Sequence, residues 1–187
     1  DGMGNLKNQK LIPGTIWITG ITASGKTTLG KRLYNDLQKS GYEDVEFFDG
    51  DLLRESLEKS FGHTLEDRFA MLEIVVDSAL KSNKNGNIAI LSSVGHKKKM
   101  RDYARTRFER FMEVYLDCSS DVCARRDHKG LYEKAKLGEI DVFAGITEPY
   151  EKSMNPELVL NTADMHLESC AKILLRKTIN YFSANAQ

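Results

Sequence analysis

Five short runs of apolar and β-branched residues recur along the chain, and longer stretches with helical spacing separate them. We expect the runs to form strands at Thr15–Thr19, Val45–Phe48, Ile88–Leu91, Met112–Leu116 and Leu158–Leu160. The intervening stretches are long enough for crossover helices, which place consecutive strands parallel to one another. Near-continuous apolar strands are typical of a sheet that is covered on both faces. The pattern therefore predicts an α/β fold with a doubly wound, five-stranded parallel sheet of the P-loop NTPase type.

The chain shows no internal repeat, low-complexity tract or Pro-rich linker, and its 187 residues suffice for one hydrophobic core. We therefore expect a single domain over residues 13–187, preceded by a disordered segment over residues 1–12. The stretch at about 125–150 is rich in Gly, Lys and Arg and lacks a strand pattern. We interpret it as a helical or mobile lid.

Charge and composition narrow the classes of partner. The 27 basic residues balance 27 acidic ones, whereas a protein that grips nucleic acid usually has a basic face. No apolar run is long enough to span a bilayer, so we expect no nucleic acid and no membrane as partners, and a cytoplasmic location. The cysteines Cys118, Cys123 and Cys170 lack metal-ligand spacing, and we expect buried thiols.

A phosphate-binding motif follows the first predicted strand. It fits G-x-x-x-x-G-K-[ST] at every fixed position and opens a helical run; its residues are Gly20, Ile21, Thr22, Ala23, Ser24, Gly25, Lys26 and Thr27. Backbone N–H groups of such a loop surround phosphate oxygens, and the helix N-terminus favours negative charge. We expect Lys26 to bridge the β- and γ-phosphates of ATP and Thr27 to ligate Mg²⁺. Thr28 completes the predicted nucleotide-binding set.

The phosphate loop alone does not name the acceptor, because GTPases, motor ATPases and small-molecule kinases share it. The chain is too short for most motor folds and lacks the guanine-reading pattern Asn-Lys-x-Asp. The residues therefore favour a small-molecule kinase.

Polar residues after the second predicted strand suit an acceptor. Asp49 and Asp51 end that strand, and Arg54 comes three residues later, on the same face of a predicted helix. Two carboxylates at this place suit the ordering of Mg²⁺ and the deprotonation of an acceptor hydroxyl. Both are candidate catalytic residues, and Asp49 is also a candidate metal ligand; the sequence does not divide the two roles. A helix N-cap with a surface ion pair is the structural alternative.

Charge is also concentrated at the start of the predicted lid. Cations that close over the γ-phosphate stabilise the charge of phosphoryl transfer, so Arg126 and Lys129 are candidate catalytic residues. A solvated helix face is the alternative for both.

Taken together, these segments resemble the adenylylsulfate kinase family from about residue 14 to about residue 162. The resemblance rests on the phosphate loop, Asp49-Gly50-Asp51 with Arg54, Glu66-Asp67-Arg68, Arg126-Asp127 with Lys129-Gly130-Leu131-Tyr132, Gly145-Ile146 with Pro149-Tyr150-Glu151, and Pro156-Glu157-Leu158. The family phosphorylates the ribose 3′-hydroxyl of adenylylsulfate with ATP. The resemblance implies that Asp51 contacts or activates that hydroxyl and that Phe143 stacks on the acceptor base. It further implies that Arg54, Arg68 and Lys129 engage the acceptor's anionic groups, and, by analogy, that the protein is a homodimer.

The chain departs from the family's pattern around the acceptor. His63 stands where the family usually has a Phe that covers the acceptor base, Met71 replaces an Asn, and Val94, Gly95 and His96 belong to a loop that usually reads Phe-Ile-Ser-Pro. We count these five residues among the candidate substrate-binding set. Gly95 aligns with a Ser sometimes described as a phosphorylated intermediate, so direct in-line transfer is favoured.

The residues expected around the acceptor differ from the family's pattern, whereas the ATP-binding motif is intact. The identity of the acceptor therefore stays open. A small-molecule nucleotide is the expected partner: adenylylsulfate, or cytidine diphosphoramidate, which some relatives in bacterial capsule pathways phosphorylate. A histidine in place of Phe supplies a hydrogen-bonding edge and a smaller stacking surface. A regulatory nucleotide-binding module without turnover, and a shikimate or gluconate kinase, are the remaining alternatives.

Overall fold

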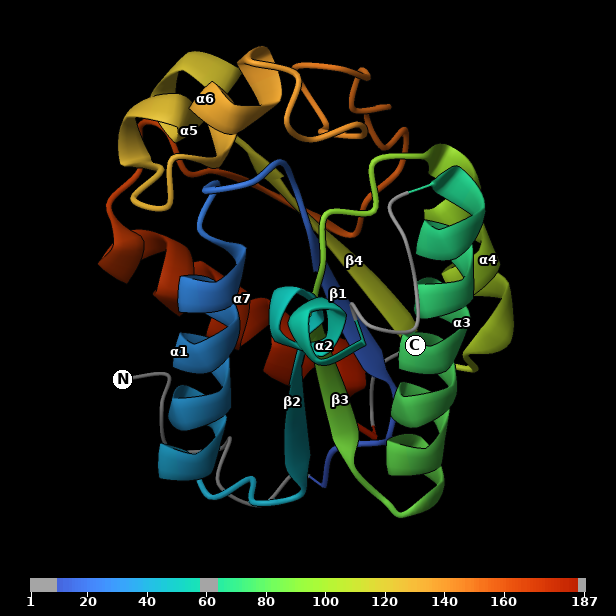
Figure 1. Cartoon of the computed structure of the whole chain (residues 1–187). Helices are drawn as coiled ribbons and strands as arrows, with labels where there is room; N and C mark the ends of the chain where they lie inside the picture. Colours follow the sequence, from blue (N-terminus) through green and yellow to red (C-terminus); the bar gives the residue numbers. More distant parts are fainter. Residues whose placement is uncertain (1–9, 58–63, 185–187) are drawn as a thin grey trace.

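A five-stranded parallel sheet forms the centre of the protein (Figure 1). The computed structural model describes residues 10–57 and 64–184. The strands are β1 (Thr15–Thr19), β2 (Val45–Asp49), β3 (Ile88–Ser92), β4 (Phe111–Asp117) and β5 (Leu158–Asn161). They lie in the order β2-β3-β1-β4-β5, and neighbouring strands are parallel. The predicted sheet is confirmed, and each predicted run lies within an observed strand.

Helices cover both faces of the sheet, as the doubly wound prediction requires. They are α1 (Lys26–Lys39), α2 (Gly50–Leu57), α3 (Leu65–Lys84), α4 (Lys98–Arg107), α5 (Ser120–Arg126), α6 (Leu131–Lys136) and α7 (Leu167–Phe182). Helices α1 and α7 pack on one face, and α3 and α4 pack on the other (Figure 1). Successive side chains of a strand point to opposite faces. Ile16 and Ile18 of β1 therefore join the core beneath α1 and α7, whereas Trp17 joins the core beneath α3 and α4.

Helix α3 begins at a capping box. The Thr64 side chain accepts a hydrogen bond from the Asp67 N–H at 3.1 Å, and the Asp67 carboxylate accepts one from the Thr64 N–H at 3.2 Å. This reciprocal arrangement satisfies donors that the first turn of a helix leaves open. It fixes the turn of α3 that carries Arg68, which faces the candidate site.

The segment from α5 to Tyr150 lies over the carboxyl ends of the strands (Figure 1). It contains two short helices and a loop, and it has an apolar cluster of its own that includes Ile21 of the phosphate loop and Phe143. The Tyr132 hydroxyl donates a hydrogen bond to the Thr22 carbonyl at 2.7 Å, which joins this segment to the phosphate loop. The predicted lid is therefore helical in part; its mobility stays a prediction. The three cysteines are buried and free, as expected.

The first described residues lie against the end of α7. Leu11 forms an antiparallel bridge with Ser183, and the Ile12 N–H donates to the Phe182 carbonyl at 2.7 Å. Residues 1–9 of the expected disordered segment lie outside the described residues, and the single domain over residues 13–187 stays a prediction. Within the described ranges, no helix is both long enough and apolar enough to cross a membrane.

Candidate active site

The phosphate loop turns sharply between β1 and α1. Gly25 has φ 107°, a conformation that glycine adopts without strain. Ala23 has φ 65° and is the one residue other than glycine with positive φ in the described part of the chain. Strained backbone of this kind is typical of functional loops. From the end of β5, the Thr162 hydroxyl donates to the Ser24 carbonyl at 2.7 Å and holds the loop in place.

Two polar side chains of the loop are enclosed. Lys26 is 5% exposed, and its Nζ donates to the Ile21 carbonyl at 3.0 Å across the loop. Burial lowers the pKa of Lys26, while the carboxylates of Asp51 and Asp49 act in the opposite direction. The Ser24 hydroxyl is enclosed and has no partner among the described residues. A loop with such donors suits phosphate oxygens.

Asp49 connects the phosphate loop to α2. Its Oδ2 accepts a hydrogen bond from the Thr27 hydroxyl at 3.3 Å, and its Oδ1 accepts the N–H groups of Asp51 at 2.9 Å and Leu52 at 3.4 Å. Asp49 therefore accepts N–H groups at the start of α2, as the capping part of the alternative holds, and its metal-binding role stays a prediction. Adjacent hydroxyl and carboxylate oxygens are ligands that Mg²⁺ prefers. Within the described ranges no group of three or more His, Cys, Asp or Glu could hold a metal, so phosphate and water oxygens would complete the coordination of an ion here.

A cavity of about 400 Å³ opens between the phosphate loop, α2, α3 and the α5–Tyr150 segment. This volume is in the usual range for small-molecule sites. Its rim is charged and exposed, and includes Asp51, Glu55, Lys129 and Lys134. Its inner wall is mainly apolar and buried, and includes Trp17, Met71, Leu72, Val75, Met100 and Phe143. Thr22 lines the cavity as well, so the cavity and the phosphate loop share an edge.

The cavity brings together most of the predicted acceptor residues. They are Asp51, Arg68, Met71, Val94, Gly95, His96, Lys129 and Phe143. Arg54 lies on α2, with its side chain outside the described residues, and His63 also lies outside them. Arg68 donates to the Val142 carbonyl beside Phe143, and Lys129 lies 3.7 Å from the Glu55 carboxylate as an exposed ion pair.

Arg126 lies on the other side of the phosphate loop. Its guanidinium donates to the Thr162 carbonyl at 2.8 Å, and Thr162 in turn holds Ser24. Arg126 does not line the cavity. Its predicted catalytic role therefore stays a prediction, on the nucleotide side rather than the acceptor side. Thr28 is exposed on the first turn of α1.

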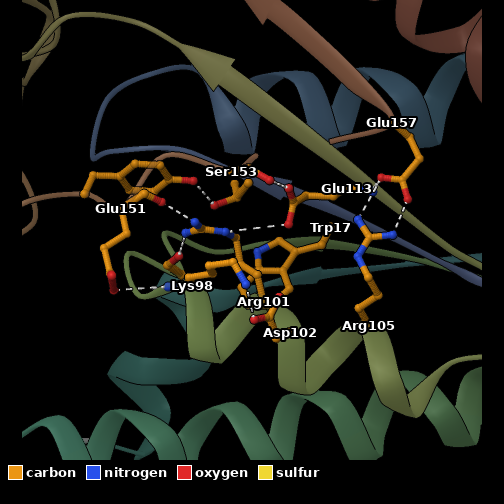
Figure 2. Close-up of polar contacts among 12 residues, drawn as sticks. Trp17, Lys98, Arg101, Asp102, Arg105, Glu113, Glu151, Ser153 and Glu157 are labelled. Carbon is orange, nitrogen blue, oxygen red and sulfur yellow. Dashed lines mark hydrogen bonds and ion pairs between the residues drawn. The ribbon is translucent and has the colours of Figure 1, made fainter. Parts of the chain in front are cut away.

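The loop after β3 forms one wall of the cavity, and four consecutive carbonyls of this loop are bonded to groups outside it. The bonds run from Trp17 Nε1 to Ser93 (3.0 Å), from Thr19 Oγ1 to Val94 (2.6 Å), from Arg101 Nη1 to Gly95, and from the Glu151 N–H to His96 (2.9 Å). Arg101 is 2% exposed, also donates to the Glu151 carbonyl, and has its Nε 3.6 Å from Glu113 Oε1 (Figure 2). The sequence did not reveal this buried ion pair, because Arg101 belongs to a strongly charged helix.

Both the backbone conformation and the neighbouring Trp17 side chain favour glycine at position 95. Its φ is 55°, and a Cβ at this position would lie 2.4 Å from Trp17 Cζ2. No side chain fits there while Trp17 keeps its place. The expectation of direct in-line transfer stays a prediction.

Known proteins resemble this chain over most of its length. The sequence model of the adenylylsulphate kinase family matches residues 12–161. A probable adenylyl-sulfate kinase of Archaeoglobus fulgidus is 44% identical over 147 residues, which are 79% of this chain and 94% of the relative. An adenylyl-sulfate kinase of Halothermothrix orenii is 38% identical over 176 residues, which are 94% and 91% of the two chains.

A solved relative has the same architecture. The APS kinase CysC of Mycobacterium tuberculosis, in complex with AMPPNP and APS, superposes with a TM-score of 0.82 at 30% identity, over 89% of this chain and 98% of the relative. The family match covers far more than half of the chain, and several of the motifs behind the resemblance contribute residues to one cavity. The chain therefore belongs to the adenylylsulphate kinase family.

Proposed function

We propose that the protein transfers the γ-phosphoryl group of ATP to the ribose 3′-hydroxyl of adenylylsulfate, giving 3′-phosphoadenylylsulfate and ADP. The observation that carries the proposal is the shared edge of the phosphate loop and the cavity, which Thr22 of the loop and Asp51 of α2 both line. In-line transfer requires donor and acceptor to face each other across such an edge. The relatives named adenylyl-sulfate kinase, and the solved relative with AMPPNP and APS, support this acceptor.

The phosphate loop binds the triphosphate of ATP. Lys26 lies beside the β- and γ-phosphates and neutralises the charge that grows on them as the phosphoryl group leaves. The enclosed Ser24 hydroxyl donates to a phosphate oxygen. Thr27 and Asp49 would hold Mg²⁺, which supplies further charge neutralisation on the phosphates when it is bound.

Asp51 is placed to activate the acceptor. It lies on the first turn of α2 at the cavity rim, and its charge acts on Lys26. Its carboxylate accepts the proton of the 3′-hydroxyl as the hydroxyl oxygen attacks the γ-phosphorus and ADP departs. Asp49 is occupied with Thr27 and the start of α2, which favours Asp51 as the base.

The rest of the cavity positions the acceptor. Arg68 and Lys129 supply cations for the phosphosulfate group. Phe143 offers an apolar ring for the base, and it is held edge-on by Tyr132, with ring centroids 4.9 Å apart and planes at 78°. A ring fixed in this way loses little entropy when a base stacks on it.

The test is ADP release, followed through a coupled assay, against a panel of acceptors: adenylylsulfate, cytidine diphosphoramidate, shikimate and gluconate. We expect release that depends strictly on adenylylsulfate, with Lys26→Ala as the inactive control. Release that requires cytidine diphosphoramidate instead would move the function to that acceptor. Binding of ATP without release under any condition would support a regulatory module.

The homodimer and the cytoplasmic location that the family implies stay predictions. Sedimentation velocity would give a mass near twice the 21.1 kDa of the chain if the homodimer forms. A monomer at micromolar concentration would contradict the analogy.

A further inference from the structure

His96 is a buried polar side chain in the apolar part of the acceptor cavity. It is 2% exposed, and among the described side chains that line the cavity it is the polar one that is buried. The other polar lining groups, such as Asp51 and Lys129, lie at the open rim. Trp17, Met100 and Phe143 line the wall together with His96, and each is buried as well. A ligand that enters the inner part of the cavity therefore meets the imidazole.

The protonation of the ring follows from its partner. His96 Nε2 lies 2.8 Å from Oε2 of Glu148, and this hydrogen bond lowers the pKa of Glu148, so the carboxylate is ionised at neutral pH and can only accept. Burial lowers the pKa of His96, with Arg68 and Lys97 acting in the same direction and Glu148 in the opposite one. The ring is therefore neutral, with its proton on Nε2, and Nδ1 is left as an acceptor.

Nδ1 is available to a ligand. Among the described residues no side chain or backbone group donates to it, yet it is not one of the enclosed unpartnered atoms of that part of the chain. Nδ1 therefore keeps some exposed area, and the cavity is the open space that His96 lines. A buried acceptor without a donor is unfavourable unless a ligand or water supplies one.

The polarity of the cavity orients a nucleotide acceptor within it. In the proposed function the ribose hydroxyl meets Asp51, beside the phosphate loop, and the anionic group meets Arg68 and Lys129, which line the cavity as well. That placement leaves the apolar inner part of the cavity, which Phe143 and His96 both line, for the base. The polar atoms on the edge of the base then come within reach of Nδ1.

We propose that His96 is a specificity-determining residue whose Nδ1 accepts a hydrogen bond from the exocyclic amine of the acceptor's base. The cavity thereby selects an acceptor whose base carries an amine over one whose base lacks it. The inference rests on the proposed function, since it concerns the acceptor side of the same reaction. The resemblance to the family does not give His96 a role in recognising the base.

The test compares two acceptors that differ in one group: adenylylsulfate and its purine riboside analogue, with hydrogen in place of the amine. For the wild-type protein we expect kcat/KM to favour adenylylsulfate by about tenfold to a hundredfold, because the analogue leaves a buried acceptor unpaired. His96→Leu keeps an apolar side chain of similar size and removes the acceptor atom. In this variant the preference falls to about one, mainly through loss of activity on adenylylsulfate.

Lys97→Met is the matched control. Lys97 Nζ lies 3.4 Å from the same Glu148 carboxylate, but Lys97 does not line the cavity. The preference of this variant stays at the wild-type value. If His96 only tethers Glu148, His96→Leu lowers kcat/KM for both acceptors equally and the preference persists, which overturns the proposal.

The wild-type measurement can overturn the proposal even where His96→Leu fails to fold. Equal use of the two acceptors overturns the role of His96 and leaves the proposed function intact. Absence of turnover with either acceptor overturns the proposed function itself. The two failures are therefore distinguishable in one set of assays.

Discussion

Two arginines of α4 allow a direct comparison between a buried and an exposed ion pair. Arg101 pairs with Glu113, and both side chains are at most 3% exposed, whereas the Arg105 side chain, paired with Glu157, is 40% exposed (Figure 2). Arg101→Met leaves the Glu113 carboxylate buried without its cation, which costs about 3–5 kcal/mol of unfolding free energy. Arg105→Met breaks a solvated pair and costs about 1 kcal/mol or less.

Urea unfolding measures this difference. The chain has one tryptophan, Trp17, which is buried in the core cluster that α3 and α4 cover and bonded to the loop after β3, so its fluorescence reports on this region. The double variant Arg101→Met with Glu113→Gln recovers part of the loss, because it removes the unpaired charge. The carbonyls of Gly95 and Glu151 lose a donor in both variants, so KM for the acceptor rises while ATP binding is retained.

Two results would refute this reasoning. Equal losses of unfolding free energy in Arg101→Met and Arg105→Met would show that burial does not set the strength of an ion pair here. A double variant no more stable than Arg101→Met would show that the unpaired carboxylate is not the source of the loss.

Three further predictions concern the phosphate loop, its contact with Tyr132, and the proposed base Asp51. Lys26→Ala lowers kcat by about 10²-fold or more in the ADP-release assay, since charge on the β- and γ-phosphates is no longer neutralised; near-normal turnover would contradict the role of the loop. Asp51→Asn retains ATP binding, measured by calorimetry, and loses transfer by about 10²-fold or more; full activity, together with an inactive Asp49→Asn, would exchange the two roles. Tyr132→Phe removes the hydrogen bond to the Thr22 carbonyl and lowers the unfolding free energy by about 1 kcal/mol. Thermal melting without nucleotide measures this loss, with Tyr103→Phe as the control.

Much of the fold could be predicted because its signals are local. A strand buried on both faces must be apolar at nearly every position, and a phosphate loop requires its glycines and lysine within eight residues. The predicted strands ended early at polar residues such as Asp49, Ser92 and Asn161, where the backbone pairing in fact continues. Asp49 lies beside Thr27 of the phosphate loop, so at the end of this strand a site residue interrupts the apolar pattern.

The wall of the cavity could not be predicted, because its contacts join distant parts of the chain. His96 and Glu148 are 52 residues apart in sequence, and neither position has a periodicity that singles it out. Arg101 lies in a helix of mostly charged residues, which the usual rules assign to solvent. The position of Arg126 beside Thr162 follows from the tertiary packing of α5 rather than from its charge.

The contact between Trp17 and Gly95 constrains how this enzyme can diverge. A lineage that acquires a hydroxyl-bearing residue at position 95 must also shift this loop or replace Trp17 by a smaller side chain, because the added Cβ would lie 2.4 Å from Trp17 Cζ2. The smaller side chain alone would leave a void in the core, which is itself destabilising. The two positions are therefore expected to covary among descendants, so that a side chain at position 95 is found together with a smaller residue at position 17 or a rearranged loop.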